Sequence, residues 1–272
     1  MIKSPLRYPG GKSRALGQIE AQMIDGFSEF REPFVGGGSV FIYFRQKYPQ
    51  AQFWINDLNP DVFLFWKIAQ SHLDQLVNQV KKIKLTANNG RDLFKELTTC
   101  NVATLSELDR AVRFFVLNRI TFSGTIEAGG YSEGAFQKRF TDSSIDRLAK
   151  LGLILPSIKI TNLDFHEVII EPGENTFIFL DPPYYSATKS KLYGKKGDYH
   201  TRFDHQRFAQ TIQTCPHPWL ITYDDSPTIR ELFTNSHIQT WQLQYGMNNY
   251  KQEIAAKGSE LFIRNYSHDA LS

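Results

Sequence analysis

The 272-residue sequence has little cysteine, no long apolar run and almost no net charge, and each absence excludes a class of protein. Its two cysteines, Cys100 and Cys215, have neither CxxC nor metal-ligand spacing, so the sequence predicts no disulfide framework and no metal site. No apolar run approaches the length of a membrane span, and the first residues lack the apolar core of a secretory signal. We therefore expect a cytoplasmic protein that does not associate with a membrane.

The net charge of +3 is small, but its placement is uneven. Residues 66–147 contain 12 Lys and Arg against 9 Asp and Glu, whereas basic and acidic residues balance in the rest of the chain. This excess is compatible with a segment that faces phosphate groups. Aromatic residues reach 14%, which indicates either aromatic-rich cores or stacking surfaces for bases, and a core is the better explanation for most of the 21 Phe.

Hydrophobic content of 41% and charged content of 22% are ordinary for a globular protein, either one large domain or one domain with an insertion. The order of patterns predicts a mostly parallel sheet with helices on its faces, an antiparallel hairpin at one edge, and a helical insertion. The domains would be 1–65 with 148–272, and the insertion 66–147. Strands are expected at 51–57, 158–163, 175–180, 219–223, 237–245 and 260–266. Helices are expected at 60–80, 105–120 and 226–233, and a further helix is expected to begin at a capping box formed by Ser143 and Asp146.

Glycines 36–38 follow a short apolar segment and precede a helix. They lack the spacing of a dinucleotide fingerprint and the lysine of a P-loop, which makes a pyrophosphate cradle a poor explanation. Glycine here lets the backbone turn tightly and approach a ligand. Asp57 ends the next predicted strand, where a carboxylate can accept from ribose hydroxyls. An equally good explanation of Asp57 is a residue at the start of a helix, beside the cap Asn59.

The tetrapeptide Asp181-Pro182-Pro183-Tyr184 follows an apolar strand that is expected to be buried on both faces. It therefore lies at the carboxyl end of a core strand, where open α/β sheets bind their ligands. Two prolines remove two backbone donors and fix two φ angles. What remains is a rigid row of acceptors, the Asp181 carboxylate and the backbone carbonyls, beside the aromatic face of Tyr184. This arrangement suits a planar amino group on an aromatic ring, because the amino group can donate to the acceptors while its ring stacks on Tyr184.

Taken together, these motifs resemble those of the Dam-like DNA adenine methyltransferases. The matching elements, in the family's order, are Tyr8-Pro9-Gly10-Gly11-Lys12, Phe34-x-Gly36-x-Gly38, Asn56-Asp57, an insertion, Asp164-Phe165, and Asp181-Pro182-Pro183-Tyr184. The resemblance implies a doubly wound, Rossmann-like sheet that binds S-adenosylmethionine and ends in an antiparallel hairpin, with the insertion as a target-recognition domain.

The resemblance also implies residue roles. Cofactor contacts would come from Tyr8, Lys12, Phe34, Gly36, Gly38, Asp57, Asp164, Phe165 and Asp181, and the catalytic residues would be Asp181, Pro182, Pro183 and Tyr184. Lys12 could also pair with a carboxylate of the protein or with the cofactor's own carboxyl group. Taken singly, Phe34 and Phe165 are more often core residues than ligands, and the segment around Lys12 could be an ordinary turn leading into a helix.

The insertion departs from the GATC-specific members of the family, which puts GATC specificity in doubt. Residues suited to base edges or phosphates are Asn118, Arg119, Ser123 and Thr125, although a glycine-rich turn that closes a helix explains them about as well. Lys195 and Lys196 belong to a segment, 189–197, that we interpret either as a loop closing over DNA or as a solvated basic loop.

The function expected from the resemblance is site-specific transfer of a methyl group to the N6 amino group of adenine in double-stranded DNA, with base flipping and no metal. The product of the cofactor would be S-adenosylhomocysteine. Such a chain would be prokaryotic or phage-encoded, and a cognate restriction endonuclease would be a plausible partner. The alternatives are methylation of RNA adenine, methylation of a protein glutamine amide, and a catalytically inactive DNA-binding protein on the same fold.

Overall fold

The computed structural model describes residues 1–126, 129–186, 203–244 and 257–267. In these ranges one sheet has the strand order β3-β2-β1-β4-β5-β7-β6. The strands are β1 (Glu29–Glu32), β2 (Gln52–Asn56), β3 (Lys159–Thr161), β4 (Thr176–Leu180), β5 (Trp219–Asp224), β6 (His237–Gln244) and β7 (Lys257–Arg264). The strands from β3 to β5 pair in parallel, whereas β7 is antiparallel to both β5 and β6. The predicted α/β sheet with a terminal antiparallel hairpin is confirmed.

The strand order reverses between β1 and β4. The chain adds β2 and β3 on one side of β1, and then returns to place β4 and β5 on its other side. The carboxyl ends of β1 and β4 are therefore neighbours at a topological switch point, the place where doubly wound sheets bind ligands. The glycine segment follows β1, and Asp181 follows β4.

The two faces of the sheet bury alternate residues of each strand. In β4, Phe177 and Phe179 join the larger hydrophobic cluster, whereas Ile178 and Leu180 join the smaller one. Helices of the larger cluster include α1 (Leu16–Glu20), α2 (Ser39–Lys47) and α3 (Pro60–Ser71); those of the smaller one are α9 (Phe165–Ile170), α11 (His205–Gln213) and α12 (Pro227–Leu232). All five residues of β4 are buried, as predicted for a central strand.

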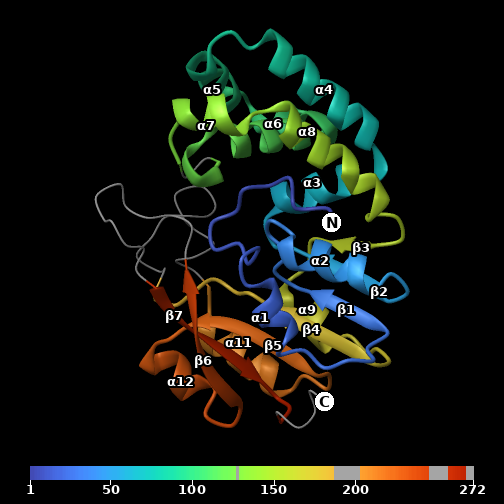
Figure 1. The fold of residues 1–272 in the computed structure, drawn as a ribbon, viewed down its shortest axis with the longest axis vertical. Coiled ribbons are helices and arrows are strands. Elements are labelled where there is room, and N and C mark those ends of the chain that lie inside the picture. Colours follow the sequence, from blue (N-terminus) through green and yellow to red (C-terminus); the bar gives the residue numbers. More distant parts are fainter. Residues whose placement is uncertain (127–128, 187–202, 245–256, 268–272) are drawn as a thin grey trace.

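Helices of the predicted insertion lie together at one end of the molecule, drawn green in Figure 1. They are α4 (Leu73–Thr86), α5 (Gly90–Thr99), α6 (Glu107–Ile120), α7 (Glu133–Arg139) and α8 (Asp142–Ala149), with short 3-10 turns at Val102–Thr104, Phe122–Gly124 and Lys150–Leu153. Phe65 of α3 stacks on Phe115 of α6 with ring centres 6.1 Å apart, so one hydrophobic core continues from the sheet into these helices. The boundary at residue 66 falls inside α3 and stays a prediction. None of the helices in the described ranges is long and apolar enough to cross a membrane.

Two predicted helix features were wrong. A single helix from Pro60 through Val80 is in fact two, because His72 has φ −137° and separates α3 from α4. The apolar period continues across this break, and no glycine or proline marks it. The capping box of α8 is formed by Thr141 and Ser144, two residues before the predicted Ser143/Asp146 pair. Helices α5, α7, α9 and α11 were not predicted.

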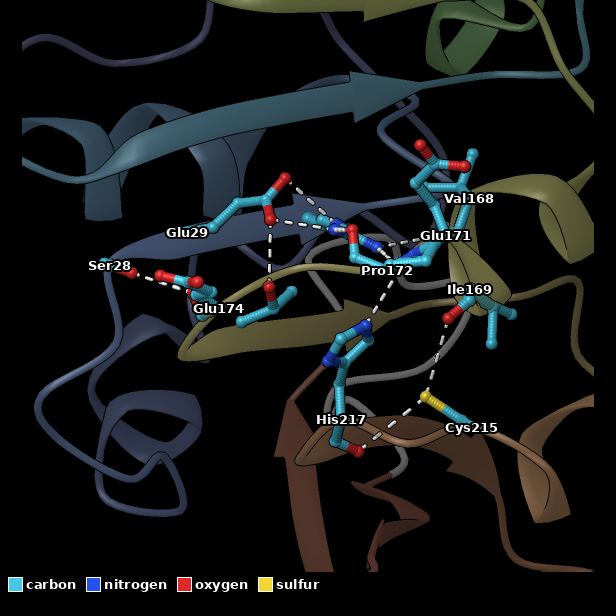
Figure 2. Close-up of polar contacts among 11 residues, drawn as sticks. Ser28, Glu29, Val168, Ile169, Glu171, Pro172, Glu174, Cys215 and His217 are labelled. Atoms are coloured by element: carbon cyan, nitrogen blue, oxygen red, sulfur yellow. Dashed lines mark hydrogen bonds and ion pairs between the residues drawn. The ribbon is translucent and has the colours of Figure 1, made fainter.

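A buried arginine, Arg31, holds the end of α9 against the sheet, and Figure 2 shows Glu29, Glu171 and Pro172 around this contact. The guanidinium of Arg31 in β1 donates to the carbonyls of Val168, Glu171 and Pro172 at the end of α9, at 3.2, 2.5 and 3.0 Å. The Glu29 carboxylate pairs with the same guanidinium at 2.8 Å. Since last-turn carbonyls have no partner within a helix, these bonds fix the carboxyl end of α9. These bonds thereby hold α9 in place, and the amino end of this helix carries Asp164 and Phe165.

Candidate functional site

The glycine segment after β1 forms a tight turn between two aromatic rings. Gly36 and Gly38 have φ of +43° and +67°, the left-handed region that favours glycine. A Cβ on Gly36 would lie 2.7 Å from the ring of Tyr8, and one on Gly38 would lie 2.5 Å from Trp66. The indole of Trp66 donates to the Gly36 carbonyl at 3.1 Å. The structure thus brings Tyr8, Gly36 and Gly38 together, and their contact with a cofactor stays a prediction.

The carboxylate of Asp57, the residue directly after β2, stabilises this turn through hydrogen bonds. Its Oδ2 accepts the backbone N–H of Gly36, and its Oδ1 accepts that of Asn59, both at 2.9 Å. Asn59 in turn caps α3 through a bond from the Asp61 N–H. Burial raises the pKa of Asp57 to about 6, and the two N–H bonds oppose that rise. The interpretation of Asp57 as a residue at the start of a helix is therefore confirmed, and its contact with a ribose stays a prediction.

Lys12 joins the N-terminal segment to the Asp181 motif. Its buried ammonium lies 2.8 Å from Asp181 Oδ1 and 2.9 Å from Oδ2, and it donates to the Gly10 carbonyl at 2.8 Å. The same ammonium lies 4.8 Å from the centre of the Tyr184 ring. The expected pairing of Lys12 with a carboxylate is confirmed, and its partner is the aspartate of the motif.

Acidic groups cluster at the carboxyl ends of β1, β2 and β4. Glu32, the last residue of β1, is 3% exposed, and its Oε2 has no hydrogen-bond partner among the described residues. Burial, followed by the negative charges of Asp181 and Asp57, raises the pKa of Glu32 well above its ordinary value. A buried carboxyl with an unpartnered oxygen is costly, so a cationic or donor group is expected at this position when the site is occupied.

Asp164 is the N-cap of α9 and Phe165 is its first residue, directly after β3 along the chain. Asp164 accepts the N–H of His166 at 2.9 Å and pairs with both terminal nitrogens of Arg207, at 2.7 and 3.0 Å. Although burial acts to raise the pKa of Asp164, the bonds from Arg207 and His166 hold it below its ordinary value. Phe165 is buried 5.8 Å from the Phe34 ring, so the two predicted aromatic residues are brought together but lie in the smaller hydrophobic cluster.

The Asp181 motif is held from the side of β5 and β7. Thr222 donates to Asp181 Oδ1 at 2.8 Å, and the hydroxyl of Tyr184 donates to Glu260 at 2.8 Å. Asp224 accepts the backbone N–H groups of the next two residues, Tyr185 and Ser186, at 2.7 and 2.9 Å.

The sequence prediction missed these supporting residues. Glu32 and Asp224 end parallel strands, so the rule that located Asp57 could have found them. Nothing in the sequence distinguishes Thr222 and Glu260.

In the insertion, the residues proposed to contact DNA fall into different environments. Asn118 is fully buried and bonds to the backbone N–H and carbonyl of Arg7 and to the Gly124 carbonyl. Arg119 is 4% exposed and donates to the carbonyls of Pro5 and Arg139. In this structure both side chains form hydrogen bonds with backbone groups of distant segments, and neither faces a base edge.

The nearby turn is more accessible. Thr125 is half-buried and donates to the Phe122 carbonyl at 2.8 Å, whereas Ser123 is buried with φ +56°. Phe122 beside them is 68% exposed. Lys195 and Lys196, with the segment 189–197, lie outside the described residues.

A glycine turn after the first strand of a doubly wound sheet, beside an acidic Pro-Pro-Tyr motif after the fourth, defines a Rossmann-like methyltransferase that acts on an amino group. More specifically, residues 8–247 match the family model of the D12 class N6 adenine-specific DNA methyltransferases, and the chain belongs to this family.

Individual relatives agree with this assignment. The chain is 26% identical over 225 residues to the type II methyltransferase M.MjaIII of Methanocaldococcus jannaschii, covering 75% of this chain and 77% of the relative. It is 27% identical to the DNA N-6-adenine-methyltransferase of Escherichia phage P1 over 99% of this chain, which spans 35% of that protein. A DNA adenine methylase of Vibrio cholerae is 21% identical, with 66% of this chain and 64% of the relative covered. These names favour DNA adenine over the RNA, glutamine and non-catalytic alternatives.

Proposed function

We propose that this chain transfers a methyl group from S-adenosylmethionine to the N6 amino group of adenine in double-stranded DNA. The observation that carries the proposal is the position of Asp181. Its carboxylate lies at the switch point of the sheet, beside the face of Tyr184 and the ammonium of Lys12. An acceptor next to an aromatic face is what recognition of an aromatic amine requires.

The residues around the switch point fit the cofactor. The unpartnered Oε2 of Glu32 suits the ammonium of its methionine part, and the glycine turn lets the ligand approach the backbone. Asp57 would accept from ribose hydroxyls, whereas Asp164 and Phe165 would hold the adenine. When bound, the cofactor supplies an electrophilic methyl group on a sulfonium.

The chain's own residues would then orient the target base. Tyr184 would stack on the flipped adenine, and Asp181 and the Pro182 carbonyl would accept its two amino hydrogens. These contacts direct the nitrogen lone pair toward the methyl group, so the catalysis is chiefly positioning and electrostatics. Asp181 is also placed to take up the proton that the nitrogen loses.

The insertion would contact the DNA. It carries all the excess positive charge of the chain, and it exposes Phe122 beside Ser123 and Thr125. We propose that the last two offer hydroxyls to base edges or phosphates, and that Lys195 and Lys196 contribute phosphate contacts. Asn118 and Arg119 would act indirectly, by fixing the shape of this turn. A cytoplasmic location and a cognate endonuclease belong to the same proposal, since one relative is named as a type II methyltransferase.

The test is methyl transfer by the purified chain. Labelled S-adenosylmethionine would be supplied with duplex DNA, with single-stranded RNA, and with a glutamine-containing protein. We expect label in duplex DNA at adenine N6, and a rate on the order of a hundredfold lower with Asp181→Ala, since one positioned acceptor contributes about that much. Sequencing DNA from a methylation-free host that expresses the chain would identify the methylated sequence. Label in RNA or protein alone would disprove the proposal.

A further inference from the structure

The hydroxyl of Tyr184 donates to a glutamate of the terminal hairpin. Glu260 lies in β7 and is 1% exposed, and its Oε2 is 2.8 Å from the hydroxyl oxygen. Burial, together with the negative charges of Asp181 and Glu260, raises the pKa of Tyr184 well above its ordinary value. The hydroxyl therefore keeps its proton and acts as the donor in this bond.

The antiparallel direction of β7 explains how Glu260 reaches the site. Parallel strands bring their carboxyl ends to the site, whereas β7 brings residues near its amino end. In the register of the β5–β7 pair, Glu260 is opposite Asp224, the last residue of β5. The hairpin is thus the element that places a carboxylate at the hydroxyl of Tyr184.

Two further contacts from β5 hold the same motif. Thr222 orients the Asp181 carboxylate, and Asp224 holds the backbone that leaves the motif. Thr222, Asp224 and Glu260 are all buried, at 0%, 8% and 1% exposure. Thr222 also bonds to the Tyr184 hydroxyl, so the carboxylate and the ring share this neighbour, whereas Glu260 is the acceptor of the hydroxyl proton.

A buried carboxyl is retained at a cost to folding. Burial raises the pKa of Glu260 to about 7, although Lys12 and the bond from Tyr184 oppose the rise. An apolar residue at this position would avoid that cost but would leave the Tyr184 hydroxyl without its acceptor. A Tyr ring rotates about two bonds, and a hydrogen bond to its hydroxyl fixes the direction in which the ring points from the backbone.

We propose that Glu260 is a positioning residue for methyl transfer: it holds the Tyr184 ring in the position at which the target base stacks on it. The terminal hairpin then forms part of the active site and does not merely close the edge of the sheet. This inference rests on the proposed function, because the ring has to stack on a base for its position to matter. A misplaced stacking surface slows the chemical step without weakening a cofactor that Asp57, Asp164 and Phe165 would hold.

The test compares Glu260→Ala, Glu260→Gln, Tyr184→Phe and the double variant Tyr184→Phe/Glu260→Ala. The single-turnover rate of methyl transfer is measured on duplex DNA with saturating cofactor, and the Kd of the cofactor is measured separately. We expect Glu260→Ala and Tyr184→Phe each to slow transfer on the order of tenfold, with the cofactor Kd changed less than about twofold. Glu260→Gln should recover much of the rate, since its amide oxygen still accepts from the hydroxyl.

The double variant separates a shared role from two independent ones. If Glu260 acts through the hydroxyl, its removal from Tyr184→Phe should slow the reaction no further. The exposed Glu231 of α12 supplies the matched control, and Glu231→Ala should keep the wild-type rate. Additive losses, or a folded Glu260→Ala protein with the wild-type rate, would overturn the inference while the wild-type activity stands. A wild-type chain that methylates no duplex DNA would overturn the proposed function, and this inference with it.

Discussion

The ammonium of Lys12 lies 2.8 Å from Asp181 Oδ1 and 4.8 Å from the centre of the Tyr184 ring. These are the acceptor and the aromatic face that the proposed function assigns to the target adenine. Lys12 thus compensates the charge of a partly exposed carboxylate. The contact also makes the stability of the chain depend on two residues of the site.

Removing either partner of this pair should destabilise the fold. Lys12→Ala leaves Asp181 with the Thr222 hydroxyl but without its cation, and Asp181→Ala leaves a buried ammonium without its carboxylate. A fully buried pair would cost about 3–5 kcal/mol, and solvent contact at Asp181 reduces this to about 2–3 kcal/mol for each variant. Urea unfolding of the two single variants and of the double variant measures the coupling.

The double variant should lose clearly less stability than the two single losses added together, because it leaves no uncompensated charge. Lys3→Ala removes an exposed lysine from the same N-terminal segment and serves as the control. Strict additivity in this cycle would show that the ion pair contributes nothing to folding.

Gly38 should not tolerate a side chain. Its φ of +67° costs an alanine about 1–2 kcal/mol, and a Cβ would lie 2.5 Å from the ring of Trp66. Gly38→Ala should therefore lower the free energy of unfolding by at least about 2 kcal/mol and weaken cofactor binding. Gly17→Ala is the matched control, since its Cβ meets nothing within 4 Å, and it should stabilise α1 by up to about 1 kcal/mol. Equal stability of the two variants would contradict the packing described for the turn.

The sequence predicted those parts of the fold and site that depend on local patterns. Strand β4 was predictable from a short apolar run, and the position of Asp181 followed from the rule that ligands bind at the carboxyl ends of parallel strands. The glycine turn carried its own signal, because few other residues adopt positive φ.

The parts that were missed depend on contacts between distant segments. Glu260 reaches Tyr184 through the register of β5 with β7, which the sequence does not reveal. Arg119 had the chemistry of a DNA ligand, but its guanidinium bonds to the Pro5 carbonyl, 114 residues away along the chain. The break at His72 is set by how α3 and α4 pack, since the apolar pattern runs through it.

Arg119→Ala is now expected to act on stability before it acts on DNA. The variant leaves the carbonyls of Pro5 and Arg139 without a donor, which should cost about 2 kcal/mol in unfolding free energy. Burial, followed by the charges of three nearby arginines, lowers the pKa of Arg119 to about 9, so removing the charge offsets part of this loss. Arg91→Ala, at an exposed position of α5, should leave stability unchanged. If Arg119→Ala kept the wild-type stability but discriminated less between DNA sites, the side chain of Arg119 would be assigned to base recognition.

Asp57 should make both stability and cofactor binding depend on pH. Its pKa is about 6 in the folded chain against 3.8 ordinarily, so the folded state holds this proton more tightly than the unfolded state. The stabilisation from that proton is complete below about pH 4 and is lost as the pH rises through about 6. Asp57→Asn removes this contribution, and the difference between the two proteins isolates it from the titration of the nearby Glu32.

If the ionised carboxylate accepts from ribose hydroxyls, cofactor affinity of the wild-type chain should rise between pH 5 and 7, whereas that of Asp57→Asn should not. Calorimetric titrations across this range measure both affinities, and parallel curves for the two proteins would leave Asp57 only its structural bonds to Gly36 and Asn59.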